Sequence, residues 1–133
     1  MLLFLQTCLL VISIFVTMKI YGIKNCNTVK KALDWFGEKN IEYEFHDFKK
    51  LGISEIKLEE WSSKLGWEPL INKRGTTWKQ LGPEIQKGIN SKQEAFKLMQ
   101  EKTSVIKRPV IETDKHILTG FDEAAYKKLF DLQ

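Results

Sequence analysis

The sequence predicts an α/β fold in which a mixed sheet carries a helical insertion. Three observations lead to this prediction. The first third of the chain alternates between short apolar runs and helical spacing, which is typical of a βαβ unit. Residues 54–102 then have the spacing of several helices and no strand-like alternation. Two short apolar runs and one amphipathic segment close the chain, so the predicted order is β-α-β, helices, β-β-α.

Length and composition favour a single soluble globular domain. The chain has 133 residues, of which 43% are hydrophobic and 29% are charged. A chain of this length and hydrophobic content can bury a core that is stable without disulfide bonds or a structural metal. The formal net charge of +4 comes from lysines that are dispersed among acidic residues. Nucleic-acid-binding domains typically concentrate positive charge in a stripe or patch, so we expect no direct binding to nucleic acid.

The first 17 residues contain no charged side chain, and three interpretations compete for them. A membrane anchor needs about 20 apolar residues, so the segment is at the short limit. A signal peptide has a basic start and a small-residue cleavage site, and neither is present. We favour an extension before a natural start at Met18, because a strand pattern begins there without a linker. A chain that starts at Met18 is expected to fold and stay soluble, with residues 18–133 as the only domain.

Cysteine usage predicts a reducing compartment. Cys8 lies in the apolar leader, and Cys26 is the one cysteine in the body of the chain. A single cysteine cannot build a disulfide framework, and domains without one are typical of reducing compartments. We therefore expect a cytoplasmic protein, unless residues 1–17 are a real membrane anchor.

The first unit of the fold is predicted to be a parallel βαβ pair. Residues 19–23 read as a strand, and a helix follows from Asn27 or Thr28 to Lys39, with Thr28 as its cap. Residues 41–48 alternate between apolar and polar, which is the period of a half-buried strand. The helix is long enough to cross over between two parallel strands.

The predicted insertion begins with a helix over residues 55–65, capped by Ser54 and ended by Gly66. Several short helices follow, and one of them begins with a capping-box pattern at Ser91 and Glu94.

A β-hairpin and a helix are predicted to close the domain. The runs 106–113 and 116–120 flank a turn at Asp114 and Lys115. Residues 121–132 follow as a helix with Asp122 as its cap.

Cys26 lies between the first predicted strand and the first predicted helix, which makes it the candidate nucleophile. Backbone N–H groups at a helix start lack intrahelical partners, and the helix dipole adds positive charge there. Both effects favour the thiolate, which is the nucleophilic form of cysteine. A buried apolar cysteine is the alternative, but Asn25 and Asn27 on either side are polar. We therefore predict a reactive Cys26 with a lowered pKa.

Three segments carry motifs of one known family. They are Tyr-Gly-Ile-Lys-Asn-Cys-Asn-Thr-Val-Lys-Lys-Ala at 21–32, Asn-Lys-Arg-Gly-Thr-Thr-Trp at 72–78 and Ile-Lys-Arg-Pro at 106–109. Together they resemble the ArsC-like family, which holds glutaredoxin-linked arsenate reductases, Spx-type transcriptional regulators and a small YffB-like branch. The Arg-Gly-Thr-Thr-Trp string points to the YffB-like branch. The resemblance covers residues 18 to about 131 and implies a thioredoxin/glutaredoxin-like sheet.

The resemblance also implies a set of site residues. Cys26 matches the nucleophilic cysteine of the family, and Arg74 and Arg108 match two arginines that line the oxyanion site of the arsenate reductases. Pro109 matches a proline that is usually cis in thioredoxin-like folds, and its backbone and that of Asn25 would form the thiol site. The alternatives are a solvated turn for Arg74 and a surface charge for Arg108.

Two departures from the family pattern bear on the substrate. The arsenate reductases carry a third arginine after the hairpin, where this chain has Gly120 and Phe121, so arsenate itself is in doubt. Many Spx-type regulators have a Cys-X-X-Cys motif, but here Val29 replaces the second cysteine. A mixed disulfide at Cys26 would then be resolved by glutathione or a partner protein.

The leading hypothesis is therefore a thiol-dependent reductase that uses glutathione or a glutaredoxin and acts on a small oxyanion or disulfide. An Spx-type redox regulator that binds RNA polymerase or another protein is the alternative, and a non-catalytic relative is a third. Neither a bound cofactor nor a metal is expected, because His46 and His116 lack partners at metal-ligand spacing.

Overall fold

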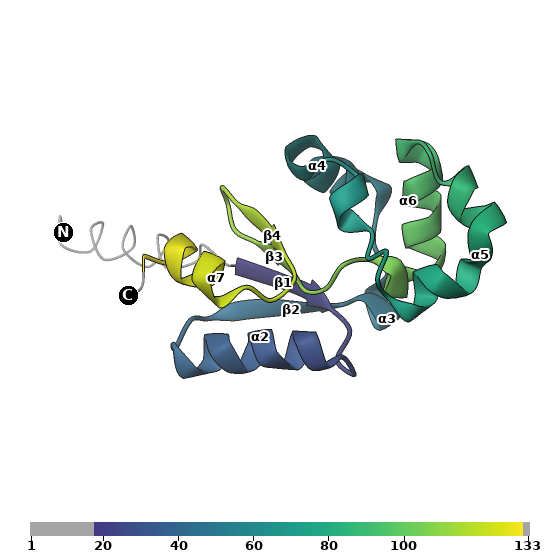
Figure 1. The fold of residues 1–133 in the computed structure, drawn as a ribbon. Helices are drawn as coiled ribbons and strands as arrows, with labels where there is room; N and C mark the ends of the chain where they lie inside the picture. The colour runs from purple at the N-terminus through teal and green to yellow at the C-terminus, as the bar shows by residue number, and fades with distance from the viewer. Residues whose placement is uncertain (1–17, 132–133) are drawn as a thin grey trace, which may run out of the picture.

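A four-stranded mixed sheet organises the protein (Figure 1). The structure is a computed structural model and describes residues 18–131, so the predictions about residues 1–17 lie outside it. The strands are β1 (Met18–Gly22), β2 (Tyr43–Asp47), β3 (Val110–Glu112) and β4 (Ile117–Thr119). They lie in the order β2-β1-β3-β4, with β1 and β2 parallel and the other pairs antiparallel. The predicted α/β class, parallel pair and hairpin are confirmed.

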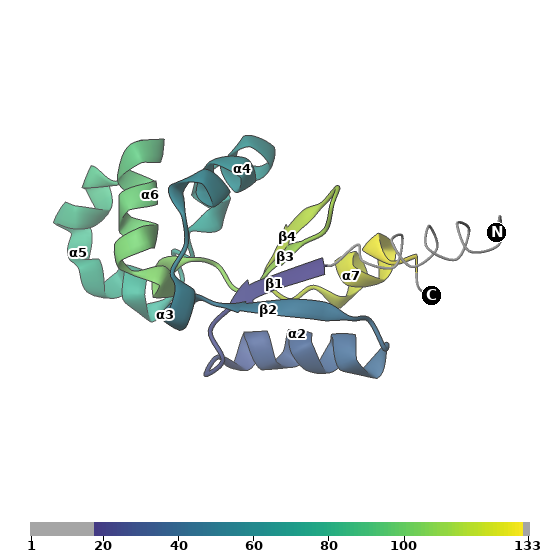
Figure 2. The same cartoon turned by 180° about the vertical axis from the view of Figure 1, so that it is seen from behind.

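Two helices cover one face of this sheet (Figure 2). They are α2 (Asn27–Glu38) and α7 (Glu123–Leu129). Their apolar side chains pack with strand residues that point to the same face, because side chains alternate along a strand. The principal members of this cluster are Met18, Ile20, Ala32, Trp35, Phe36, Ile111 and Tyr126.

The insertion forms a helical block at the end of the sheet where β1 and β2 terminate (Figure 1). Its elements are α3 (Phe48–Leu51), α4 (Glu55–Leu65), η1 (Glu68–Leu70), α5 (Thr76–Gly88), α6 (Lys92–Glu101) and η2 (Thr103–Val105). They share a second apolar cluster with the alternate strand residues Tyr21, Val110 and Ile117. As predicted, no strand lies within residues 54–100, and the only pairing there is an isolated bridge from Ile71 to Ile106.

Several predicted helix caps are confirmed by hydrogen bonds. The side chains of Ser54, Ser91 and Asp122 each accept from a backbone N–H in the first turn of their helices. Gly66 ends α4 with a φ of 82°, which lies in the left-handed region that favours glycine. Local sequence signals therefore fix where these helices begin and end.

Other boundaries differ from the prediction. Thr28 is not the cap of α2, because the helix begins one residue earlier and Cys26 occupies the cap position. A short helix, α3, forms between the predicted strand 41–48 and the predicted helix 55–65, since Asp47 caps it by accepting from the backbone N–H of Lys49. The final helix ends at Leu129 rather than at residue 132.

None of the helices within residues 18–131 combines the length and the apolar character needed to cross a membrane.

Glu112 joins the helical block to the sheet. Its carboxylate, 17% exposed, accepts hydrogen bonds from Trp61 Nε1 at 2.8 Å and Tyr21 Oη at 3.1 Å, and pairs with Lys57 Nζ at 3.1 Å. Burial alone would raise the pKa of Glu112, but the donated hydrogen bonds and the Lys57 charge outweigh it and lower this pKa. Burial would lower the pKa of Lys57, but its hydrogen bonds and ion pairs with Glu60 and Glu112 outweigh burial and raise this pKa.

Removing this carboxylate is expected to destabilise the fold. Glu112→Ala leaves two donors without their acceptor and leaves the half-buried Lys57 paired only with Glu60, so we expect a loss of roughly 2–4 kcal/mol in the free energy of unfolding. Urea denaturation measures this loss. Glu60→Ala is the matched control, since it also removes a partner of Lys57 but Glu60 is 55% exposed, and it should cost below about 1 kcal/mol.

The Glu112 contribution also depends on pH. Because the folded-state pKa is lowered, the stabilisation is present above the unfolded-state pKa and is lost as the pH falls through the folded-state pKa. The stability gap between the wild type and Glu112→Gln should therefore narrow from pH 7 to acid. A gap that stays constant with pH, or a Glu112→Ala loss as small as that of Glu60→Ala, would rule out this account.

Candidate active site around Cys26

Cys26 lies where the chain leaves β1 and enters α2. Its φ and ψ of −144° and 122° are extended, and it occupies the N-cap position, so its side chain lies next to the free N–H groups of the first turn. The approach of α2 to β1 requires a glycine at 22. A Cβ on Gly22 would lie 2.9 Å from Val29 Cγ2. The tight contact between Gly22 and Val29 thus fixes the position of the helix start.

The pKa of the Cys26 thiol is lowered. Partial burial acts in the opposite direction, but it is outweighed by the backbone N–H of Val29, the Arg108 guanidinium and the N–H of Thr28. The sulfur makes no capping hydrogen bond of ordinary geometry, so we attribute the effect to the electrostatic field of these nearby donors. Cys26 is half-buried and has no disulfide partner within residues 18–131, and the site therefore favours an accessible thiolate.

Arg108 is the charged side chain that accompanies Cys26. Its Nη1 donates to the carbonyl oxygen of Ser104 at 2.6 Å, which anchors the guanidinium. Its Nε is buried and has no acceptor within the described part of the chain. A buried donor without an acceptor is costly, so this guanidinium is suited to bind an anion. The Arg108–Pro109 peptide bond is cis, as expected.

A bridge between distant segments places Arg108 beside the insertion. Asn72 donates to the Val105 carbonyl and Lys107 donates to the Leu70 carbonyl, both at 2.8 Å from backbone nitrogen to oxygen. These bonds flank the isolated bridge between Ile71 and Ile106. The segment around Asn72 therefore lies next to the residues that lead into β3.

Arg74 is placed less directly than the sequence suggested. It is exposed, and its backbone N–H donates to Asn72 Oδ1 at 3.2 Å. Arg74 is not among the groups that lower the pKa of Cys26, and its guanidinium makes no ion pair within residues 18–131. The structure thus brings Cys26 and Arg108 together and leaves Arg74 on the nearby turn. Asn25, which precedes the cysteine, is exposed, and Pro109, which follows Arg108, is buried.

An open pocket of about 700 Å³ lies beside this pair. Thr28, Asn72, Lys107 and Arg108 line it, together with residues 119–124 from the end of β4 and the start of α7. Thr28 is one of the residues whose N–H acts on the Cys26 sulfur. Cys26 itself does not line the pocket, but Thr28 and Arg108, which both act on its sulfur, do, so a molecule in the pocket would lie close to the nucleophile.

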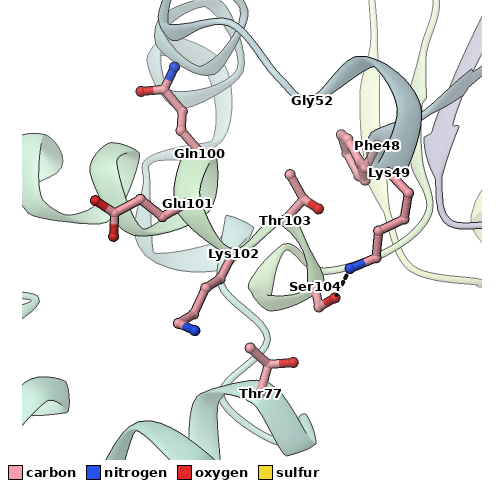
Figure 3. A pocket seen from close by; sticks show the side chains of 9 residues that line it. All are labelled: Phe48, Lys49, Gly52, Thr77, Gln100, Glu101, Lys102, Thr103 and Ser104. Atoms are coloured by element: carbon pink, nitrogen blue, oxygen red, sulfur yellow. Dashed lines mark hydrogen bonds between the residues drawn. The ribbon is translucent and has the colours of Figure 1, made fainter.

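A second hollow, of about 520 Å³, lies between α3, α6 and η2 and is shown in Figure 3. Lys49 lines this hollow, and its ammonium donates a hydrogen bond to Ser104 Oγ at 3.0 Å. No cysteine or histidine lines it. It touches the candidate active site only through Ser104, whose carbonyl oxygen anchors Arg108.

The histidines and two of the tryptophans lie in the following surroundings. His46 Nε2 lies 2.7 Å from the Gly52 carbonyl oxygen, and His116 is exposed on the hairpin. Trp78 is buried in the insertion cluster, and Trp67 packs against the same cluster. Within residues 18–131 no group of three or more acidic, cysteine or histidine side chains has a metal-binding arrangement.

The sequence-based reasoning missed three residues near the site. Lys107 and Asn72 line the pocket, and Gly120 forms part of its wall. The Lys107-Arg108 pair before a proline was a usable signal for Lys107. Asn72 and Gly120 reach the pocket through hydrogen bonds between distant segments, which no local sequence pattern predicts.

Comparisons with known proteins agree with this architecture. The ArsC family matches residues 21–129. A protein of Haemophilus influenzae that is described as uncharacterized is 40% identical over 111 residues, which cover 84% of this chain and 96% of that protein.

Solved structures show the same relationship. The structure named YFFB (PA3664) protein has a TM-score of 0.79 and 39% identity, covering 84% of this chain and 97% of that one. An arsenate reductase (ArsC) related protein from Brucella melitensis has a TM-score of 0.70 and 38% identity, covering 89% and 98%. With its fold, its helix-start cysteine and its matched segments all in agreement, this chain belongs to the ArsC family.

Proposed function

We propose that the protein is a thiol-dependent reductase in which Cys26 is the single nucleophile and glutathione, or a glutaredoxin partner, restores it. The observation that carries this proposal is the Cys26 environment. The thiol is accessible, its pKa is lowered by Arg108 and two backbone N–H groups against the effect of burial, and an open pocket adjoins it. Reactive cysteines typically have such an electropositive, partly exposed surrounding.

The proposed reaction has two exchange steps. The Cys26 thiolate attacks one sulfur of a disulfide RSSR, forming a mixed disulfide with one half and releasing the other half as the thiolate RS⁻. A glutathione thiolate then attacks the sulfur of the bound half, and Cys26 leaves as a thiolate. One glutathione is consumed, and the products are RS⁻ and the disulfide GSSR, so electrons and sulfur atoms balance.

The chain supplies three elements of this reaction. The α2 N-terminus and Arg108 hold Cys26 as a thiolate, which makes it both a good nucleophile and a good leaving group near neutral pH. Arg108 also lines the pocket, where its guanidinium can bind a negatively charged group of the substrate. Val29 lies where a second thiol would stand one turn along, so the resolving thiol comes from outside.

An oxyanion is the second substrate class that this site could take. Arg108 would hold it directly, and Arg74 would join only if its exposed side chain turned toward the pocket. The family contains arsenate reductases, but Gly120 and Phe121 stand where a third arginine was expected, which favours a disulfide over arsenate.

Mass spectrometry of the full chain with oxidised glutathione tests the proposal. We expect one glutathione adduct on the peptide that contains Cys26, which free glutathione then removes. Cys8→Ser should leave the adduct in place, and Cys26→Ser should abolish it. A Cys26 that stays unmodified while an unstructured thiol peptide reacts would eliminate the reductase proposal. Capture of RNA polymerase subunits together with an inert Cys26 would favour the regulator hypothesis instead.

A further inference from the structure

Two cationic residues, Lys107 and Arg108, line the pocket beside Cys26. Arg108 is anchored by Ser104, but the Lys107 ammonium makes no ion pair or hydrogen bond within residues 18–131. Lys107 is exposed at the pocket, while Arg108 is half-buried. Lys107 is therefore the cation that is free to meet a charged group arriving from solvent.

Gly120 fixes the course of the Lys107 side chain. A Cβ at position 120 would lie 3.2 Å from Lys107 Cε, so the lysine stem passes directly over this glycine. Gly120 is held in place from both sides, since its N–H donates to the Pro109 carbonyl at 2.8 Å and its own carbonyl accepts from Tyr126 Oη at 2.6 Å. Its φ of +79° also disfavours any other residue. The lysine stem therefore lies against Gly120, a residue that has no side chain and that two hydrogen bonds hold in place.

Two acidic residues, Asp122 and Glu123, also line the pocket. Both are engaged within their own helix: Asp122 accepts from the backbone N–H of Ala125 at 3.1 Å, and Glu123 pairs with Lys127 at 3.2 Å. Neither forms an ion pair with Lys107. Acidic residues in the same pocket disfavour a compact, multiply charged oxyanion more than a ligand that presents a single carboxylate.

The size of the pocket also favours an organic ligand. At about 700 Å³, it falls in the range of sites that bind whole small molecules, roughly 300–1,000 Å³. An inorganic oxyanion would fill only a small part of it.

We propose that this pocket binds a carboxylate-bearing thiol or disulfide, with Lys107 as the specificity-determining residue that receives the carboxylate while Cys26 reacts with the sulfur. This inference rests on the proposed thiol-disulfide chemistry of Cys26 and adds the class of its substrate. It assigns the second cation of the site to Lys107 rather than to Arg74.

Paired disulfide probes of different charge test this assignment. The rate at which Cys26 forms a mixed disulfide is measured by intact-protein mass spectrometry for anionic 3,3′-dithiodipropionate and for neutral 2-hydroxyethyl disulfide. Lys107→Gln should slow the reaction with the anionic probe roughly 3- to 10-fold, which is typical of one lost charge pair at a partly exposed site. The neutral probe should react within about twofold of the wild-type rate.

Two further variants separate local recognition from other effects. Lys107→Arg keeps the charge and should restore most of the rate with the anionic probe. Lys87→Gln makes the same change in net charge on an exposed part of α5 and should change neither rate. Equal slowing of both probes, or no slowing of the anionic one, would overturn the role of Lys107 even with Cys26 fully reactive. A wild-type Cys26 inert to both probes would overturn the proposed function itself.

Discussion

Cys26→Ser is expected to lower glutathione-dependent disulfide reduction by about 10³-fold or more, because a serine hydroxyl does not ionise near neutral pH and cannot form the mixed disulfide. The loss should not come from unfolding. Serine is among the preferred N-cap residues, and Cys26 already holds the N-cap position of α2 without a capping hydrogen bond. We therefore expect the variant to be as stable as the wild type or slightly more stable.

The measurement is turnover of 2-hydroxyethyl disulfide with glutathione, alongside thermal unfolding of the same samples. Cys8→Ser is the matched control, since it removes the other cysteine of the sequence, and it should keep full activity. If Cys26→Ser retains a tenth or more of the activity, or if Cys8→Ser loses it, the nucleophile lies elsewhere.

Arg108→Ala is expected to slow the alkylation of Cys26 by iodoacetamide roughly tenfold at mildly acidic pH, because the loss of one nearby opposite charge raises the pKa of the thiol. The direction of this change follows from the fraction of Cys26 that is present as the thiolate. A higher pKa leaves less thiolate below it, and at alkaline pH both proteins are fully ionised, so their rates should converge. Arg108→Lys keeps a charge but loses the planar guanidinium that bonds Ser104. Its alkylation rate should therefore lie between those of the wild type and Arg108→Ala.

Arg74→Ala is the comparison for this experiment, since Arg74 has the same charge but is not among the main causes of the lowered pKa of Cys26. It should leave the alkylation rate within about twofold of the wild type. If Arg74→Ala slows alkylation as much as Arg108→Ala does, the two arginines act together and the geometry around Cys26 has to be revised.

Local patterns predicted most of the fold. Ser54, Ser91 and Asp122 were identifiable as caps because a capping side chain bonds to a backbone N–H only two or three residues away. The cap of α2 was misplaced because cysteine is not a usual capping residue, so Thr28 was chosen from its residue type. The sequence also gave no sign that Asp47 would begin the short helix α3.

The candidate site was only partly predictable. Cys26 could be found from its position before a helix, and Arg108 from the family resemblance. Lys107 had a usable signal in its place beside Arg108 and Pro109, but Gly120 did not, because its contact with Lys107 joins the approach to β3 with the end of β4. Glu112 was missed for a similar reason. It lies in a short apolar strand, and its donors Trp61 and Lys57 belong to the distant helix α4.

The central claim is that the start of α2 and Arg108 hold Cys26 as a thiolate. The pH dependence of Cys26 alkylation in the full chain carrying Cys8→Ser tests it most directly, with an unstructured cysteine peptide as the reference. We predict a midpoint below that of the peptide, and a shift of this midpoint to higher pH in Arg108→Ala. A wild-type midpoint at or above that of the peptide, or one that Arg108→Ala leaves in place, would contradict the claim.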